Sequence, residues 1–328
     1  MKTALYSEHW NRFWSLPPEI VEWLRADFPQ IEFVHARTEQ QIAESLQDAE
    51  IYFGYRLPKE ALEGAAGLKW IHVPAASVHP LSDLELDKRG VTVTNSRGLH
   101  AGPISEHVIG CMLVFARKFV ECWEYQLDHR YAAREILTEG PPIGELRGKT
   151  VVILGLGSIG TEIARLCKAF KMRVVAVKKN TNETYETVDQ LFKATEFRHA
   201  LPEADYLVVA VPQTAATEGM IGEAELKLLK KSCVLINIAR GSIIEEDAMM
   251  KALKENWIRG AALDVFHTEP VPANSDLYDL PNVFMTPHTS GVSALEHWPR
   301  VMELFAENLR RYIAGQPLMN VVDLREGY

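Results

Sequence analysis

The sequence predicts an α/β protein with two domains, each built on a mainly parallel β-sheet. Short runs rich in β-branched and aromatic residues alternate with helix-like segments along most of the chain, which is the pattern of βαβ units. In the second half these runs are almost continuously apolar, as expected for strands covered by helices on both faces. The length of 328 residues favours two domains of ordinary size over one.

The first hundred residues contain the first series of strands. A helix is expected over PPEIVEWLRADF (17–28), because a proline in the first turn is pre-set for a helix start. Four β-rich runs follow and are expected to be strands: IEFVH (31–35), EIYFG (50–54), LKWIHV (68–73) and VTVTN (91–95).

A long helix is expected next, followed by a second series of strands. From Pro103 to about Phe119 apolar residues recur at helical spacing. The second series of strands reads TVVILG (150–155), RVVAV (173–177), YLVVAV (206–211), CVLINIA (233–239), GAALDV (260–265) and NVFMT (282–286). A last helix is expected over about residues 295–313.

Glycine and proline residues mark two candidate domain boundaries. Gly98, Gly102 and Pro103 mark the first, and Gly291 marks the second. If the chain crosses between domains at both points, the last helix returns to the first domain and the middle domain is an insertion. The expected domains are 1–100 with 294–328, and 101–293.

Composition and charge narrow the class of protein. The hydrophobic fraction of 47% and charged fraction of 24% are those of a well-packed soluble protein. The net charge of −9 argues weakly against nucleic acid as a partner. No run of about 18 apolar residues occurs, and the N-terminus does not resemble a signal peptide. We therefore expect a cytoplasmic protein that does not bind membranes.

The cysteines also bear on this expectation. Cys111, Cys122, Cys167 and Cys233 lie far apart, mostly inside apolar segments. Because neither a C-x-x-C pair nor a Cys/His cluster occurs, no metal site is expected. We interpret the four as buried free thiols, which suit a reducing compartment.

One glycine-rich segment predicts a nucleotide site. Gly155, Gly157 and Gly160 form the pattern G-x-G-x-x-G directly after an expected strand and at the start of an amphipathic helix. There the glycines permit a tight turn, close approach of the backbone to a pyrophosphate, and close packing of helix on strand. The first helical turn, with Ser158 and Ile159, offers N–H groups and a partial positive charge to the phosphates.

The end of the next strand bears on which dinucleotide binds. An acidic residue that binds the ribose hydroxyls usually stands there, but here Lys178 and Lys179 take its place. A lysine accepts no hydrogen bond from a hydroxyl, although it can neutralise a 2′-phosphate. We therefore expect NADP(H) rather than NAD(H). The alternative is that the lysines are a solvated strand end and that NAD(H) binds without the acid.

A series of motifs runs through the chain and indicates a family. In order, the chain contains NSRGLHAGPISEHVIGCMLVFARK, the glycine loop, VPQTAATEGMI, LINIARGSIIEEDA, ALDVFHTEPVP, NVFMTPHTSG and ENLRRYIAGQPLMNVVD. Together, over roughly residues 50–325, they resemble the D-isomer-specific 2-hydroxyacid dehydrogenases, such as glyoxylate and hydroxypyruvate reductases. The resemblance implies a Rossmann nucleotide-binding domain inserted into a flavodoxin-like substrate domain.

The resemblance implies a catalytic trio, and each member is chemically suited to its role. Arg240 ends an expected strand, and its planar fork suits the carboxylate of a 2-keto acid. His288 would protonate the carbonyl oxygen as hydride arrives at carbon, and remove that proton in the oxidation direction. Glu269 would hold the imidazole in one tautomer and stabilise its protonated form.

Further cofactor contacts are implied by the same resemblance. Asp264 is expected to accept a hydrogen bond from the nicotinamide carboxamide. Backbone contacts are expected from Ile238, Ala239 and Gly291, and the loop beneath the cofactor is expected to include Val211, Pro212 and Thr217.

The sequence departs from the family pattern at the expected substrate loop. Family members often carry A-G-V-D there, whereas this chain reads PAASVHP. The N–H groups of Ala76, Ser77 and Val78 remain candidates for binding the substrate carboxylate. This difference leaves the loop's shape, and therefore the identity of the 2-keto acid, open.

The resemblance also implies a homodimer, formed through the helix over 104–119 and the segment after it. Two other functions remain open. One is a dinucleotide-sensing, corepressor-like interaction protein, and the other is a different enzyme on the same fold, such as a phosphite dehydrogenase. The motifs favour a dehydrogenase that transfers hydride between NADP(H) and a small 2-keto acid.

Overall fold

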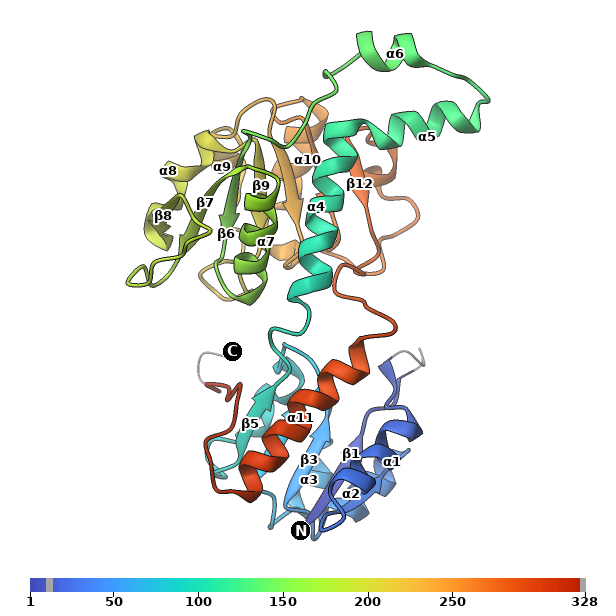
Figure 1. The fold of residues 1–328 in the computed structure, drawn as a ribbon, viewed down its shortest axis with the longest axis vertical. Helices are drawn as coiled ribbons and strands as arrows, with labels where there is room; N and C mark the ends of the chain where they lie inside the picture. The colour runs from blue at the N-terminus through green and yellow to red at the C-terminus, as the bar shows by residue number, and fades with distance from the viewer. Residues whose placement is uncertain (10–13, 325–328) are drawn as a thin grey trace. The chain divides into compact units, whose positions relative to one another are not determined.

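The computed structural model describes residues 1–9 and 14–324 (Figure 1). The chain forms two compact units. Unit 1 contains Met1–Leu99 and Ser293–Tyr328, so both ends of the chain belong to it, and unit 2 contains His100–Val292. Within the described ranges, no helix is both long and apolar enough to cross a membrane.

Unit 1 is built on a sheet of five parallel strands in the order β2-β1-β3-β4-β5. The strands are β1 (Lys2–Tyr6), β2 (Glu32–His35), β3 (Ile51–Gly54), β4 (Trp70–Val73) and β5 (Thr92–Asn95). This order is that of flavodoxin-like sheets. The four strands expected in this region are confirmed as β2 to β5.

The prediction missed β1, which is a central strand. Its sequence KTALY has only two consecutive aliphatic residues, Ala4 and Leu5, and a polar Thr3 that is fully buried. A five-residue segment of this kind has too weak a β pattern to be recognised without its neighbours. Pairing with β2 and β3 on both sides stabilises it as a strand.

Helices cover both faces of this sheet. α1 (Pro18–Asp27) and α11 (His297–Ile313) pack on the face that carries Leu5 and Phe53. α2 (Glu39–Leu46) and α3 (Lys59–Glu63) pack on the face that carries Ala4 and Tyr52. Alternate residues of each strand therefore contribute to two separate apolar clusters.

Unit 2 is built on a sheet of seven parallel strands in the order β12-β11-β10-β9-β6-β7-β8. The strands are β6 (Thr150–Leu154), β7 (Arg173–Lys178), β8 (Gln190–Lys193), β9 (Tyr206–Val209), β10 (Val234–Asn237), β11 (Gly260–Leu263) and β12 (Val283–Met285). From β8 to β11 this is the Rossmann order, 3-2-1-4-5-6 in chain sequence, extended by β12. Successive strands are added to one side of β6 up to β8, and to its other side from β9 to β12. This reversal of strand order lies between β6 and β9, which is where such sheets bind ligands.

All six strands expected in this region are confirmed, and β8 was missed. β8 lies at the edge of the sheet and pairs only with β7. Its residues QLFK are partly buried or exposed, so they lack the continuous apolar pattern of the inner strands.

The helices of unit 2 also lie on both faces of the sheet (Figure 1). α4 (Ala101–Arg117) and α7 (Ser158–Ala169) pack on one face. The other face is covered by three short helices: α8 (Phe197–Ala200), α9 (Glu223–Leu226) and α10 (Glu246–Lys254).

The long helix ends earlier than predicted. Lys118 has a φ of 55°, in the left-handed region, and divides α4 from α5 (Phe119–Leu127). Its buried ammonium donates hydrogen bonds to the carbonyls of Ile136 and Glu139, at 3.0 and 2.6 Å. These bonds connect the break to α6 (Ala133–Thr138).

The four cysteines are free thiols, as predicted, but they are not all buried. Cys111, Cys167 and Cys233 lie inside the apolar clusters, where burial raises the pKa of each thiol. Cys122 is exposed on α5, which corrects the prediction for that residue. α5 has no buried residue, because it does not pack on the core of the sheet.

Candidate active site

The glycine loop lies between the carboxyl end of β6 and α7, next to the reversal of strand order. Gly155 has a φ of 100°, and a Cβ there would lie 2.6 Å from the carbonyl oxygen of Ala210. Only glycine fits this turn without strain. A Cβ on Gly157 would meet no atom within 4 Å, so this side of the loop is open.

The first turn of α7 leaves backbone donors at this open side. The N–H of Thr161 donates to the carbonyl of Gly157 at 2.9 Å and begins the helical hydrogen-bond pattern. The N–H groups of Ser158, Ile159 and Gly160 come before it and are not used within the helix. This geometry fits a pyrophosphate, which binds through such donors and the positive end of the helix dipole.

Lys178, at the end of β7, forms hydrogen bonds with side chains of the loop that follows. Its Nζ donates to Oε2 of Glu183 at 2.8 Å and also contacts the Tyr185 hydroxyl. The hydrogen bond to Glu183 raises the pKa of Lys178, and the same bond lowers the pKa of Glu183. Lys179, the other predicted cofactor residue here, is exposed.

The loop after β9 carries the residues expected beneath the cofactor. The Thr217 hydroxyl donates to the carbonyl of Pro212 at 2.7 Å and accepts from the N–H of Thr214 at 2.8 Å. The loop therefore folds back on itself. Val211, which begins it, is partly buried against the core.

The predicted acid–base pair is brought together. Nδ1 of His288 lies 2.7 Å from Oε2 of Glu269, and the other carboxylate oxygen accepts from the N–H of Phe266 at 2.9 Å. The imidazole must donate at Nδ1, because an ionised carboxylate is an acceptor only. Nε2 is therefore the atom through which His288 can exchange a proton. The imidazole and the carboxylate are each partly exposed.

Asp264 anchors the loop that carries His288, a role that sequence reasoning missed. Its carboxylate is 1% exposed and accepts from the N–H groups of Thr289 and Ser290, at 2.9 and 3.0 Å, and from the Thr286 hydroxyl at 2.5 Å. These bonds stabilise His288 at a φ of 54°, which is uncommon for a residue with a side chain. The expected bond to a carboxamide remains a prediction.

Arg240 follows β10 on a turn that is stabilised by a buried amide. The side chain of Asn237 accepts from the N–H of Ala239 at 3.1 Å and donates to the carbonyl of Arg240 at 2.9 Å. The guanidinium donates one bond, of 2.6 Å, to the carbonyl of Ala239 and is exposed. Sequence reasoning missed Asn237. Its position as a polar residue at the end of an apolar strand was the signal that could have identified it.

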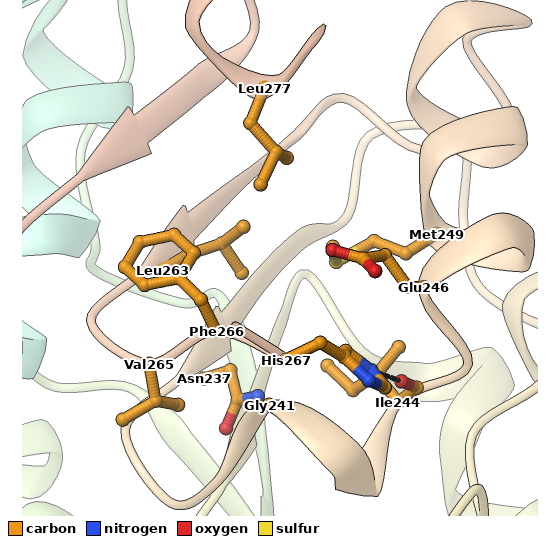
Figure 2. Close-up of a pocket in the computed structure, with 10 residues that line it drawn as sticks. All are labelled: Asn237, Gly241, Ile244, Glu246, Met249, Leu263, Val265, Phe266, His267 and Leu277. Atoms are coloured by element: carbon orange, nitrogen blue, oxygen red, sulfur yellow. Dashed lines mark hydrogen bonds between the residues drawn. The ribbon is translucent and has the colours of Figure 1, made fainter. Parts of the chain in front are cut away.

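The loops that carry Arg240 and Glu269 pack tightly on each other. A Cβ on Gly241 would lie 2.1 Å from the carbonyl carbon of Phe266, so only glycine fits there. Nε2 of His267 donates to the carbonyl of Ile244 at 2.7 Å and joins the same two loops (Figure 2). Sequence reasoning identified neither contact, because both depend on residues from different strands meeting.

A small cavity lies beside these loops, next to α10 (Figure 2). Its volume is about 10 Å³, room for about one water molecule. It is lined by Asn237, Gly241, Ile244, Glu246, Met249, Leu263, Val265, Phe266, His267 and Leu277. None of Arg240, Glu269 and His288 lines it, so this cavity is distinct from the surface that carries the three predicted catalytic residues.

The remaining predicted residues lie at the ends of strands. Ile238 is buried and Ala239 partly buried directly after β10. The carbonyl of Gly291 accepts from Nδ1 of His100 at 3.0 Å, within unit 2. In unit 1, the loop after β4 holds Ala76, Ser77 and Val78, and the carbonyl of Ala76 accepts from the Asn95 amide at 2.6 Å.

Comparison with known proteins identifies similar sequences and similar structures. Residues 109–290 match the model of the D-isomer specific 2-hydroxyacid dehydrogenase NAD binding domain. A glyoxylate reductase from Thermococcus litoralis is 34% identical over 276 residues, which are 82% of this chain and 81% of the relative.

Two solved structures are also similar. A D-isomer specific 2-hydroxyacid dehydrogenase family protein from Aeromonas salmonicida is 29% identical, with a TM-score of 0.83 over 98% of this chain and 99% of that one. A D-isomer specific 2-hydroxyacid dehydrogenase from Xanthobacter autotrophicus, in complex with NADPH and MES, is 26% identical. Its TM-score is 0.82 over 100% of this chain and 99% of that one.

Proposed function

This chain belongs to the family of D-isomer-specific 2-hydroxyacid dehydrogenases, as its motifs predicted, and we propose that it reduces a small 2-keto acid with NADPH. The proposed substrate is glyoxylate, hydroxypyruvate or a similar acid, and the product is the D-2-hydroxy acid or its achiral equivalent. The observation that carries the proposal is the 2.7 Å contact between His288 and Glu269 at the carboxyl end of the sheet of unit 2.

In the proposed mechanism each member of the trio acts at a stated atom. The guanidinium of Arg240 binds the substrate carboxylate through two parallel hydrogen bonds. Protonated Nε2 of His288 donates to the carbonyl oxygen, and Glu269 stabilises the imidazolium through Nδ1. The nicotinamide cofactor, when bound, supplies the hydride to the carbonyl carbon.

The cofactor-binding residues are proposed from the motif and from the open side of the glycine loop. Gly155 to Gly160 would hold the pyrophosphate, and Lys178 would neutralise a 2′-phosphate. The contacts expected from Val211, Pro212, Thr217, Ile238, Ala239, Asp264 and Gly291 stay predictions, as do those of Ala76, Ser77 and Val78 with the substrate. The solved relative from Xanthobacter autotrophicus is a complex with NADPH, which supports this choice.

The proposed function is tested by oxidation of NADPH and of NADH, measured side by side with a panel of 2-keto acids at neutral pH. We expect turnover with a small 2-keto acid and a higher kcat/KM for NADPH. Replacing Lys178 with aspartate should reverse the cofactor preference, because the carboxylate repels a 2′-phosphate and accepts from a ribose hydroxyl.

The outcomes separate the parts of this proposal. Turnover with NADH preferred would keep the reductase and reject the NADP(H) assignment, whereas an unchanged preference in Lys178→Asp would reject the role given to Lys178. Specific cofactor binding without turnover of any 2-keto acid would instead favour a dinucleotide sensor, and oxidation of phosphite would favour the other enzyme class.

We further propose that two copies of the chain associate through α5, α6 and the turn between them. α5 carries Phe119, Trp123 and Leu127 at a spacing of four residues, and these side chains are 52%, 57% and 61% exposed. α5 and α6 extend away from the sheet of unit 2 (Figure 1). Exposed apolar side chains gathered on one helix face indicate an interaction surface.

The dimer is tested by light scattering on the purified full chain. We expect the native chain to be a dimer and the double variant W123E/L127E to be a monomer, because two buried charges would oppose association. Leu295→Glu, at an exposed leucine of unit 1, is the control and should leave the dimer intact. A monomeric native chain, or a dimeric double variant, contradicts the proposal. The cytoplasmic location stays a prediction that cell fractionation would test.

A further inference from the structure

The loop after β7 provides the acid that the end of the strand lacks. Lys178 stands where an acid that binds ribose would be expected, and the Glu183 carboxylate lies 2.8 Å from its Nζ. The side chain of Glu183 is mostly exposed, whereas that of Lys178 is only a quarter exposed. An acidic and a basic group therefore stand together at the position that normally selects between the two dinucleotides.

Tyr185 holds this pair in place. Its hydroxyl contacts both Lys178 and Glu183, and the Lys178 ammonium lies 4.9 Å from the centre of its ring. The ring is partly buried against the apolar cluster beneath α4 and α7. The pair is therefore connected to the core of unit 2 through an aromatic side chain with few accessible rotamers.

We propose that Glu183 sets the cofactor preference of this site by competing with the 2′-phosphate of NADP(H) for the ammonium of Lys178. A 2′-phosphate and the Glu183 carboxylate are both anions, and each would be stabilised by the same ammonium. When the phosphate binds, Glu183 must share the ammonium of Lys178 with it or give up that bond, and in either case it remains near a like charge. An unphosphorylated ribose has no such conflict, and its hydroxyls can donate to the carboxylate.

Glu183 thus disfavours NADPH relative to NADH, while Lys178 has the opposite effect. The cofactor preference is then set by the balance of these two residues. This inference rests on the proposed function only in that the nucleotide must bind along the glycine loop with its ribose at the end of β7.

The test uses Glu183→Gln in the full chain, because glutamine keeps the size of the side chain and removes its charge. The probes are 2′,5′-ADP and 5′-AMP, titrated by calorimetry, with Kd values for NADPH and NADH from cofactor fluorescence. We expect the ratio of the 5′-AMP Kd to the 2′,5′-ADP Kd to rise about fivefold, the size of an exposed ion pair. The ratio of the NADH Kd to the NADPH Kd should rise in parallel.

Two further variants show that the effect comes from this pair. Glu223→Gln is the matched control, because Glu223 is also an exposed glutamate that pairs with lysines, but on α9; its Kd ratio should stay at the native value. In a Lys178→Met background, Glu183→Gln should raise the ratio less than it does in the native chain, because the part of the effect that comes from competition requires the ammonium.

Each of the remaining outcomes overturns this proposal, and one of them also overturns the NADP(H) assignment. If Lys178→Met weakens 2′,5′-ADP binding but Glu183→Gln leaves the ratio unchanged, Glu183 has no role in preference and the proposed function stands. If 2′,5′-ADP binding is insensitive to Lys178→Met, the NADP(H) assignment and this proposal fail together. A fall in the ratio on Glu183→Gln also overturns the proposal, because Glu183 would then support phosphate binding.

Discussion

Replacing His288 with asparagine is expected to lower kcat for the reduction of the preferred 2-keto acid by about 10²–10⁴-fold, the usual contribution of a positioned acid. Asparagine can still donate a hydrogen bond, but it cannot carry the proton that the carbonyl oxygen must receive. KM should change much less, because the substrate carboxylate is assigned to Arg240. The measurement is steady-state kcat and KM with saturating cofactor.

The control for this variant is His199→Asn, at an exposed histidine of α8, which should retain native kcat. Cofactor affinity of the His288 variant, measured by fluorescence, should stay near the native value and would show that the fold is intact. A kcat within a few-fold of native would mean that His288 is not the acid.

Replacing Arg240 with lysine is expected to lower kcat/KM for the 2-keto acid by about 10²-fold or more. A charge-assisted hydrogen bond contributes roughly 1.5–3 kcal/mol, and lysine cannot reproduce the two parallel bonds of a guanidinium. Part of the loss should appear in kcat, because a loosely held substrate presents its carbonyl less accurately to His288.

For Arg240 the control is Arg147→Lys, at an exposed arginine elsewhere in unit 2, which should behave as native. The NADPH dissociation constant should not change in either variant. If the Arg240 variant lost cofactor affinity and substrate affinity equally, the residue would be supporting the loop rather than binding the carboxylate.

Much of the fold was predictable because buried parallel strands have a strong apolar pattern. Six strands of unit 2, all of them except β8, were predicted, and they include apolar runs such as VVIL and VLIN. β1 and β8 were missed for different reasons. β1 contains a polar residue, Thr3, that is buried in the sheet where β1 pairs on both sides, whereas β8 is an edge strand with half-exposed side chains.

The chemical groups of the site were also predictable, but their supports were not. The motifs indicated Arg240, Glu269 and His288, and the sheet topology brings their loops to one edge. The bond from Asn237 to Arg240 lies within one turn and had a sequence signal in the asparagine at a strand end. The bonds from Asp264 to the loop of His288 instead join two strand ends, 25 and 26 positions apart in the chain. Such contacts follow from side-chain packing in three dimensions, and no spacing along the chain reveals them. Lys178 and Glu183 are only five positions apart, and their pairing was missed because it depends on the conformation of the loop after β7.

The hydrogen bond between His100 and Gly291 has a consequence for how this protein can be rearranged. His100 is the first residue of unit 2, and Gly291 is the residue before its last. The bond therefore joins the two ends of the unit across 191 positions of sequence. A segment whose two ends meet in this way can be excised, or grafted into a loop of another host, without stretching its backbone. Residues 100–292, with all three proposed catalytic side chains, therefore have the geometry of a domain that can be inserted into another protein.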